Sequence, residues 1–316
     1  MLQYKKDLLT GEGDFSMIIG YSHIVDFFTT AARENRLAHA YGFVGTAQLG
    51  KRTVARTIAA ELLHTSVEHL DRHPDFYYVE RLEDEKTGKL KKDITVAQAR
   101  ELKQRLGRTA WGDGKQVVIL DEAELLNEEA GNALLKILEE PGKNSILFLL
   151  TEDDSRLLPT IRSRVPLCYF EPLPETILAE GLKVNGVSET KVQEVLPMAW
   201  GRPGRAMQFL AEPERQQWYE KEYERIRDLR GSAFYSKVAA LEEMIGKHSS
   251  DTSDSVRDRE RLKEILDIWI MEGDVRLRQK KEKAVARQLE ELFEAKRWLG
   301  RNIHPRLLLE KVLLTF

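Results

Sequence analysis

The sequence predicts an α/β core with a parallel sheet, followed by helical segments. Two short apolar runs, Val117–Leu120 and Ile146–Leu150, flank a single helical segment. Apolar runs joined through a helix are typical of parallel strands that are covered on both faces. A further short strand, Tyr41–Val44, leads into a glycine-containing loop and another helix. Beyond Pro172 the apolar residues follow helical spacing only, which indicates an α-helical second half.

The composition sets limits on the kind of protein. The chain has 316 residues, of which 42% are hydrophobic and 32% charged, and its net charge is −3. Because the whole is not basic, any contact with nucleic acid must be local or shared with partners. Cys168 is the only cysteine, which excludes an intramolecular disulfide and a cysteine zinc site. No apolar stretch approaches the length of a membrane span, so we expect a cytoplasmic protein without membrane contact.

The elements of the first half follow from apolar spacing and from glycine and proline punctuation. In chain order we expect a polar leader over residues 1–16, a helix over Ser22–Asn35, strands at Tyr41–Val44 and Phe76–Val79, and a helix over Val96–Gly107.

The helix between the two apolar runs has clear start and stop signals. Asn127 can cap its first turn, and Glu128 and Glu129 are favourably placed near the positive end of the helix. Pro141 ends it, because proline cannot continue the hydrogen-bond ladder.

The loop after the first strand has the frame of a phosphate-binding loop. Gly45 is followed after four residues by Gly50 and Lys51, between a strand and a helix. Such glycines let backbone N–H groups turn inward, and the lysine reaches the outer phosphates. The motif requires Ser or Thr after the lysine to hold Mg²⁺, but this chain has Arg52, and Thr53 is rotated about 100° around the helix. The loop therefore predicts a phosphate-loop fold, while a tight strand-to-helix turn without Mg-ATP turnover is the alternative interpretation.

Polar residues follow two of the predicted strands. Asp121 and Glu122 come after the first apolar run, and Thr151 ends the second. At the carboxyl ends of parallel strands, such residues lie where open α/β sheets bind ligands. Asp121 could organise Mg²⁺ and Glu122 could activate water, or both could tie loops together as structural acids. Thr151 could sense a phosphate or simply end its strand.

Prolines and composition predict three domains. Pro172 and Pro174 mark the end of an α/β core over residues 1–171, and a small helical unit spans residues 172–211. Residues 212–316 are helical and charged, and their last segment, Leu307–Phe316, is apolar nearly all round, so we expect it to be buried, either within the domain or against another subunit.

Several stretches together resemble a known family. They are His73-Pro74-Asp75, Leu138-Glu139-Glu140-Pro141, Thr160-Ile161-Arg162-Ser163-Arg164 and Asn302-Ile303-His304-Pro305-Arg306-Leu307. In these stretches the chain is similar to the bacterial DNA polymerase III clamp-loader subunits of the AAA+ family, and most similar to the delta prime branch. The resemblance spans nearly the whole chain.

This resemblance implies an AAA+ core, a helical lid and an all-α collar domain. It implies a subunit of a five-membered ring that contains motor and delta-type subunits, opens a sliding clamp and places it on primer-template DNA. The family's Ser-Arg-Cys motif, here Ser163-Arg164-Val165, implies that Arg164 is supplied in trans to a neighbouring subunit's ATP site; an ordinary salt bridge is the alternative. The resemblance implies no independent catalysis by this chain, but membership of a DNA-directed DNA polymerase holoenzyme, a nucleotidyltransferase.

The chain departs from the motor members of this family in three places. Arg52 replaces the Mg²⁺-binding hydroxyl, and the arginine of the lid motif aligns with Gly204, with Arg205 one step away. The four-cysteine zinc module is missing. We therefore expect a degenerate nucleotide site at Gly45, Gly50, Lys51, Asp121, Glu122 and Thr151, no required cofactor, residual ATP or ADP binding at most, and no zinc. An ATP-hydrolysing motor subunit of the same loader is the first alternative, and a P-loop nucleotide kinase is the second.

Overall fold

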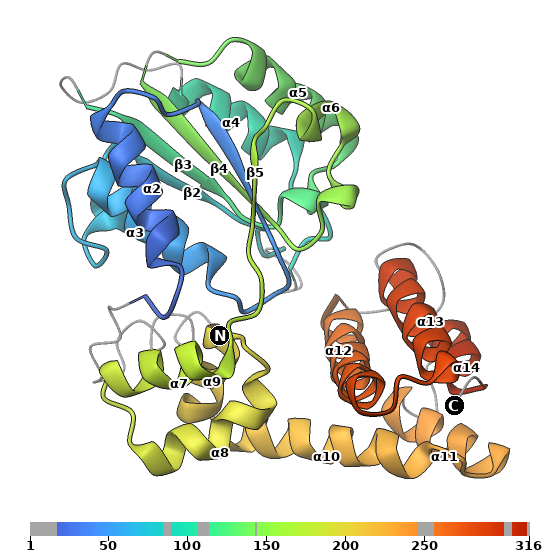
Figure 1. Cartoon of the computed structure of the whole chain (residues 1–316). Coiled ribbons are helices and arrows are strands. Elements are labelled where there is room, and N and C mark those ends of the chain that lie inside the picture. The colour runs from blue at the N-terminus through green and yellow to red at the C-terminus, as the bar shows by residue number, and fades with distance from the viewer. Residues whose placement is uncertain are drawn as a thin grey trace. The chain divides into compact units, whose positions relative to one another are not determined.

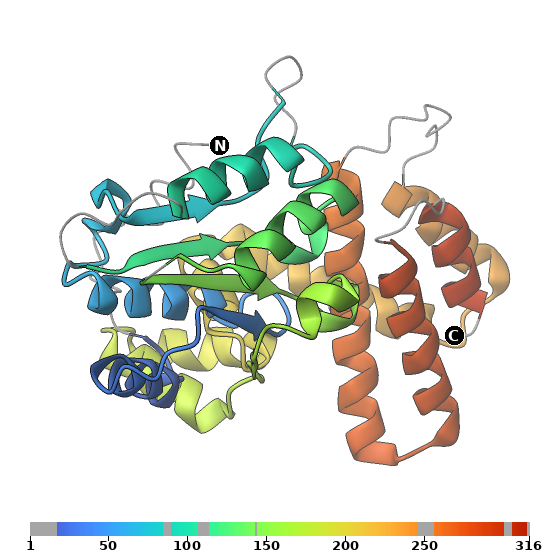
Figure 2. The same cartoon turned by 90° about the horizontal axis from the view of Figure 1, so that it is seen from above.

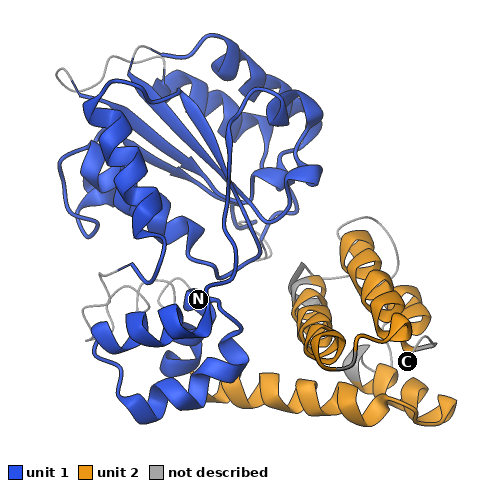
Figure 3. Ribbon diagram, in the orientation of Figure 1, with its two compact units in different colours: residues 1–211 blue, residues 212–316 orange. Residues whose placement is uncertain are grey.

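The chain forms two compact units, Met1–Ala211 and Glu212–Phe316 (Figure 3). The computed structural model describes residues 18–84, 90–106, 114–142, 144–245, 256–299 and 305–314. The division between the units falls where the sequence analysis begins its third domain, and the predicted boundary after residue 171 lies within the first unit. The predicted leader, residues 1–16, lies outside the described residues.

The first unit is built on a parallel five-stranded sheet with the order β2-β3-β4-β1-β5 (Figure 1). The strands are β1 (Ala40–Val44), β2 (Phe76–Val79), β3 (Gln116–Leu120), β4 (Ser145–Thr151) and β5 (Leu167–Tyr169). Val44 lies opposite Thr151, and Leu120 opposite Leu149, so the carboxyl ends of the central strands share one edge. The predicted parallel α/β core is confirmed.

Helices cover both faces of this sheet (Figures 1 and 2). They are α2 (Ser22–Arg33), α3 (Lys51–Leu62), α4 (Val96–Leu106), α5 (Glu128–Glu139) and α6 (Pro159–Arg162). Residues of α2 and α3 share a core with one face of the strands, and residues of α4, α5 and α6 share a core with the other. Asn127 caps α5 as predicted, since its side chain accepts a hydrogen bond from the backbone N–H of Ala130 at 2.8 Å.

The first of these cores is rich in aromatic rings. Phe28 of α2 contacts Tyr41, Phe43 and Phe148 edge-on, with ring centroids 4.7 to 5.6 Å apart. Edge-to-face pairs of this kind stabilise beyond their buried area, because the positive ring edge meets the negative ring face. The strands β1 and β4, which carry the loops of the candidate site, are anchored on this cluster.

Three further helices complete the first unit: α7 (Glu175–Val184), α8 (Glu189–Ala199) and α9 (Pro203–Ala211). They join the α/β core through a backbone hydrogen bond from Leu173 N–H to the carbonyl oxygen of Gly201. Helix α9 begins at Pro203, two residues after Gly201. Proline fits there because the first helical residue needs no hydrogen-bonded N–H.

The described part of the second unit is helical: α10 (Pro213–Leu229), α11 (Phe234–Ile245), α12 (Val256–Lys280), α13 (Lys283–Leu299) and α14 (Pro305–Leu314). Trp269 of α12 is fully buried. Within this chain Leu307 is 62% exposed, and burial of its side of α14 against another subunit stays a prediction. Helical periodicity explains this exposure, because Leu308, Leu309 and Val312 share the buried side whereas Leu307 shares the outer side with Lys311.

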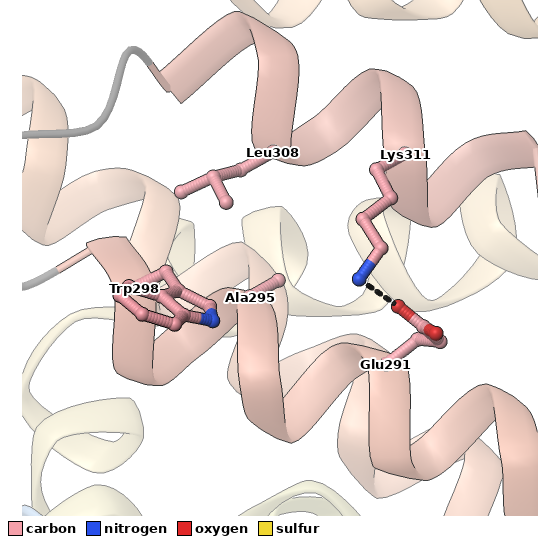
Figure 4. A pocket seen from close by; sticks show the side chains of 5 residues that line it. All are labelled: Glu291, Ala295, Trp298, Leu308 and Lys311. Atoms are coloured by element: carbon pink, nitrogen blue, oxygen red, sulfur yellow. Dashed lines mark ion pairs between the residues drawn. The ribbon is translucent and has the colours of Figure 1, made fainter.

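A shallow pocket lies between α13 and α14 (Figure 4). It is lined by Ala295, Trp298 and Leu308 and by the ion pair of Lys311 with Glu291, whose charged atoms are 2.6 Å apart. Among the described helices of the whole chain, none is long and apolar enough to cross a membrane.

The aromatic core predicts that alanine substitutions at two neighbouring residues lower the free energy of unfolding by different amounts. Phe28→Ala should lower the free energy of unfolding by about 3–5 kcal/mol, because a buried ring is lost and a cavity remains. Phe27→Ala is the matched control, since Phe27 is 59% exposed and Phe28 only 1%; its cost should be less than half as large. Hydrogen exchange of peptides that contain β1 and β4 measures both variants, and equal loss of protection would contradict the assignment of the core.

Candidate functional site

The loop between β1 and α3 depends on its two glycines for backbone reasons. Gly50 precedes α3 with φ at +93°, a left-handed conformation that favours glycine. At Gly45 an added Cβ would lie 2.6 Å from the carbonyl oxygen of Phe170, so no side chain fits. The strand–loop–helix geometry of a phosphate-binding loop is therefore present.

Lys51 is folded onto this same loop. Its ammonium group donates hydrogen bonds to the carbonyl oxygens of Gly45 and Thr46, the second at 3.0 Å, and its side chain is buried. Burial lowers the pKa of Lys51, and the nearby carboxylates of Glu152, Asp121 and Glu124 oppose that shift. The lysine charge is thus balanced by the protein's own oxygens and acids.

Arg52 binds the acid at the end of β3. Its Nε donates to Asp121 Oδ2 at 2.9 Å, and its Nη2 donates to the same oxygen. The guanidinium also lies over the ring of Tyr78, 5.3 Å from the centroid, and the Tyr78 hydroxyl donates to Asp121 Oδ2 at 2.6 Å. The other oxygen, Oδ1, accepts from the backbone N–H of Glu122 at 3.0 Å. Both oxygens of Asp121 are therefore occupied by protein donors.

The charged groups around Asp121 explain the pKa shifts of Asp121 and Tyr78. Burial disfavours the Asp121 carboxylate, but the Arg52 guanidinium and the hydrogen bonds from Tyr78 and Arg52 prevail and hold the pKa of Asp121 below its usual value. Burial and the Asp121 charge raise the pKa of Tyr78. A fixed positive group thus stands beside the acid that would hold Mg²⁺, and the Thr53 side chain is exposed. A metal ion does not fit this arrangement.

The two remaining residues that we predicted at the strand ends are also held by the chain. Arg81 donates to both carboxylate oxygens of Glu122, at 2.7 and 2.6 Å, and this arginine is buried. Thr151 is buried as well, and its hydroxyl donates to the carbonyl oxygen of Asp153 at 3.2 Å while it accepts from the Asp153 N–H. Both side chains therefore have hydrogen-bond partners within the chain in this structure.

The helices after the core reach the loop through Gln48. The backbone N–H of Gly204 donates to the Gln48 carbonyl oxygen at 2.8 Å. Arg205 Nε donates to the Gln48 side-chain oxygen at 3.1 Å, and the Gln48 amide donates to Gln208 at 2.6 Å. A Cβ at position 204 would lie 2.8 Å from the Gln48 carbonyl oxygen. Glycine at this position therefore allows α9 to contact the loop backbone directly.

Arg164 lies away from the loop, just after α6. Its Nη2 donates to Glu139 Oε1 at 2.9 Å, and its Nη1 donates to the Thr160 carbonyl oxygen at 3.1 Å. The side chain is 41% exposed. Ser163 donates its hydroxyl to the same Thr160 carbonyl oxygen at 3.2 Å. The structure thus brings Gly45, Gly50, Lys51, Asp121, Glu122 and Thr151 to one edge of the sheet, and Arg164 and Ser163 to a separate place on α5 and α6.

Sequence reasoning missed four residues that complete these arrangements: Gln48, Tyr78, Arg81 and Glu139. Tyr78 and Arg81 belong to β2 and the segment after it, which meet the acids only because β2 is the parallel neighbour of β3. The strand order could not be read from the sequence. The signal for Glu139 was present in the Leu-Glu-Glu-Pro stretch, which was used only for the resemblance.

The Asp121 contacts predict a pH dependence of stability. Asp121→Asn should lower the free energy of unfolding at pH 7 by on the order of 1–3 kcal/mol, because hydrogen bonds to a charged acceptor are weakened. The folded-state pKa of Asp121 is depressed, so this stabilisation is present above the unfolded pKa of about 3.9 and is lost as the pH falls through the folded value. Urea unfolding at pH 7 and pH 3 measures it.

The matched control is Asp71→Asn. Asp71 pairs with Arg56, which lies on α3 as Arg52 does, and Asp71 is the more exposed member of that pair. Its effect should be below about 1 kcal/mol, since exposed ion pairs contribute little. An Asp121→Asn penalty that persists unchanged at pH 3 would show that the charge of Asp121 is not the source.

The part of the chain that contains this site is similar to known proteins. A family model described as "DNA polymerase III, delta subunit" matches residues 20–174. DNA polymerase III subunit delta′ of Pseudomonas aeruginosa is 34% identical over 199 residues, which are 57% of this chain and 58% of that protein. Subunit delta′ of Escherichia coli is 38% identical over 136 residues (43% and 39%).

Subunit tau/gamma of Haemophilus influenzae is 29% identical over 177 residues, which are 53% of this chain and 25% of that protein. The chain spans about half the length, or less, of these curated relatives. The family model covers the α/β core described above. Over residues 20–174 the chain is similar to the DNA polymerase III delta family, and its similarity to the delta′ subunits makes it delta prime-like.

Proposed function

We propose that this chain is a delta prime-like subunit of a DNA polymerase III clamp loader, and that it hydrolyses no ATP itself or almost none. It supplies Arg164 in trans to the ATP site of a neighbouring subunit and helps to load a sliding clamp on primed DNA. The single observation that carries the proposal is the contact between Arg52 and Asp121.

The Arg52 contact supports the absence of turnover on electrostatic grounds. Phosphoryl transfer from ATP needs Mg²⁺ to bridge the phosphates and to neutralise developing charge. In this site Asp121 is already neutralised by a guanidinium, and position 52 offers no hydroxyl. Glu122, which would activate water, is bound by Arg81 through two hydrogen bonds.

The same arrangement bears on cofactors. The proposed subunit requires none: the loop backbone could still accept ATP or ADP, but without a metal site at Asp121 the nucleotide would stay unhydrolysed. Zinc is not expected because the chain has a single cysteine, Cys168. That the chain requires no cofactor and holds no zinc stays a prediction.

Arg164 has the chemistry that the trans role requires. A guanidinium is planar, always charged and able to hold two oxygens at once, whereas lysine offers only a point charge. Pro159 and Leu158 lead into the short helix α6, which presents the arginine on the surface of the first unit with its side chain partly exposed.

The proposed partners are motor and delta-type subunits in a five-membered ring, the sliding clamp, and primer-template DNA as part of the complex. The similarity to both delta′ and tau/gamma chains supports a loader with several subunit types. With a net charge of −3 the chain is suited to DNA contact only within such a complex. A cytoplasmic location belongs to the same proposal.

An ATP-hydrolysing motor of the same loader is the competing function, and the presence of Lys51, Asp121 and Glu122 favours it. The first functional prediction separates the two. The pure chain should hydrolyse ATP at background rate in the presence of Mg²⁺, since Asp121 is held by Arg52. A steady-state turnover assay with Lys51→Ala as control measures this, and robust activity that disappears in Lys51→Ala would establish the motor instead.

The second functional prediction concerns Arg164. In rings reconstituted with the motor and delta-type subunits, Arg164→Ala should reduce clamp- and DNA-stimulated ATP turnover, because an arginine finger contributes roughly 10³-fold or more at its own site. The observed loss is smaller if the other ATP sites of the ring still hydrolyse ATP independently. Arg164→Lys should rescue poorly.

Arg162→Ala is the matched control, since Arg162 lies two residues earlier and pairs with Asp154 at 2.7 Å. Its ring should turn over ATP normally. If rings with Arg164→Ala have normal composition and normal turnover, Arg164 is a structural arginine and the trans role is wrong.

A further inference from the structure

Arg164 is held in place by the end of helix α5. Glu139, the last residue of α5, accepts a hydrogen bond from Arg164 Nη2 at 2.9 Å, while the Thr160 carbonyl oxygen accepts one from Nη1. The two contacts come from different elements, so they fix both the direction of the side chain and the rotation of the guanidinium plane.

The position of Glu139 is unfavourable for the helix that carries it. Helix α5 begins with Glu128 and Glu129, where its partial positive charge stabilises carboxylates, but it also ends at Glu139 with Glu140 next to it. Carboxylates at the negative end of a helix are disfavoured. Arg164 compensates Glu139 there, yet both side chains are partly exposed, and exposed pairs contribute little to stability. Stability alone therefore gives a weak reason for this pairing.

The backbone frame between the two residues is tightly packed. A Cβ on Gly131 of α5 would lie 2.2 Å from the Leu158 side chain, so α5 and the segment before α6 approach as closely as glycine permits. Ile161 and Leu134 are buried in the same core. Glu139 and Arg164 thus project from two elements whose separation is fixed by the core.

The guanidinium keeps hydrogen-bond donors for another ligand. Arginine carries five N–H donors; Nη2 donates to Glu139, and Nη1 donates to the Thr160 carbonyl oxygen and to the Ser163 hydroxyl at 3.5 Å. The remaining donors, together with the partial exposure of the side chain, leave Arg164 able to bind oxygens of a second molecule while Glu139 still holds it.

We propose that Glu139 is the positioning residue for Arg164: it holds the guanidinium in the orientation in which it meets a phosphate of the neighbouring subunit's nucleotide. This inference rests on the proposed trans role of Arg164. Glu139 does not touch the nucleotide, and it acts only through the arginine.

The test uses full-length variants in reconstituted rings, with ATP turnover measured at saturating clamp and DNA over a range of ATP concentrations. Glu139→Ala should lower kcat by less than Arg164→Ala does, up to about tenfold at the site that Arg164 serves, because small misplacement of a catalytic group is costly, and it should leave KM for ATP nearly unchanged. Glu139→Gln keeps a hydrogen-bond acceptor of the same length and should retain more activity than Glu139→Ala. Glu140→Gln is the matched control and should behave as wild type.

A double variant separates positioning from a general structural effect. In the Arg164→Ala background, Glu139→Ala should cause no further loss, since the residue that it positions is gone. A further loss of similar size in that background would overturn the inference, and so would normal kcat for Glu139→Ala in rings that lose activity with Arg164→Ala. If Arg164→Ala itself has no effect, the proposed trans role fails first.

Discussion

The contact between the Arg52 guanidinium and the Asp121 carboxylate is the interaction on which the character of this site depends. It joins the first turn of α3 to the carboxyl end of β3, and Tyr78 from β2 donates to the same carboxylate. Three elements of the sheet edge are thereby tied together without an ion. A guanidinium carries one permanent charge on a side chain, so the positive group at this edge of the sheet belongs to the protein itself.

The neighbouring polar groups of the site are also bound by partners within the chain. Lys51 is bonded to its own loop, Glu122 to Arg81, and the loop residue Gln48 to the backbone of Gly204 and the side chain of Arg205. In this structure the polar groups of the candidate site have partners within the chain. Arg164 differs from them, because it is partly exposed and keeps donors beyond its contacts with Glu139 and Thr160. This partial exposure is what supports the proposed contact of Arg164 with a neighbouring subunit.

Much of this could be predicted from the sequence because it depends on local patterns. The parallel strands, the Asn127 cap and the two loop glycines each follow from a few adjacent residues. The partners of the acids could not be predicted, since Tyr78 and Arg81 meet Asp121 and Glu122 only through the strand order, and Gln48 meets Gly204 only through the return of α9 to the loop. Composition could not tell which side of the last helix is buried within this chain, and the helical period leaves Leu307 on the exposed side.

The central claim is that Arg52 stands where a metal ion would be held. The most direct measurement is the affinity of the pure chain for a non-hydrolysable ATP analogue, by titration calorimetry with and without Mg²⁺, for wild type, Arg52→Thr and Arg52→Thr/Asp121→Asn. The account predicts that any wild-type binding is insensitive to Mg²⁺, and that Arg52→Thr gains a Mg²⁺ dependence that the second substitution removes. Wild-type binding that strengthens with Mg²⁺ and loses this response in Asp121→Asn would contradict it.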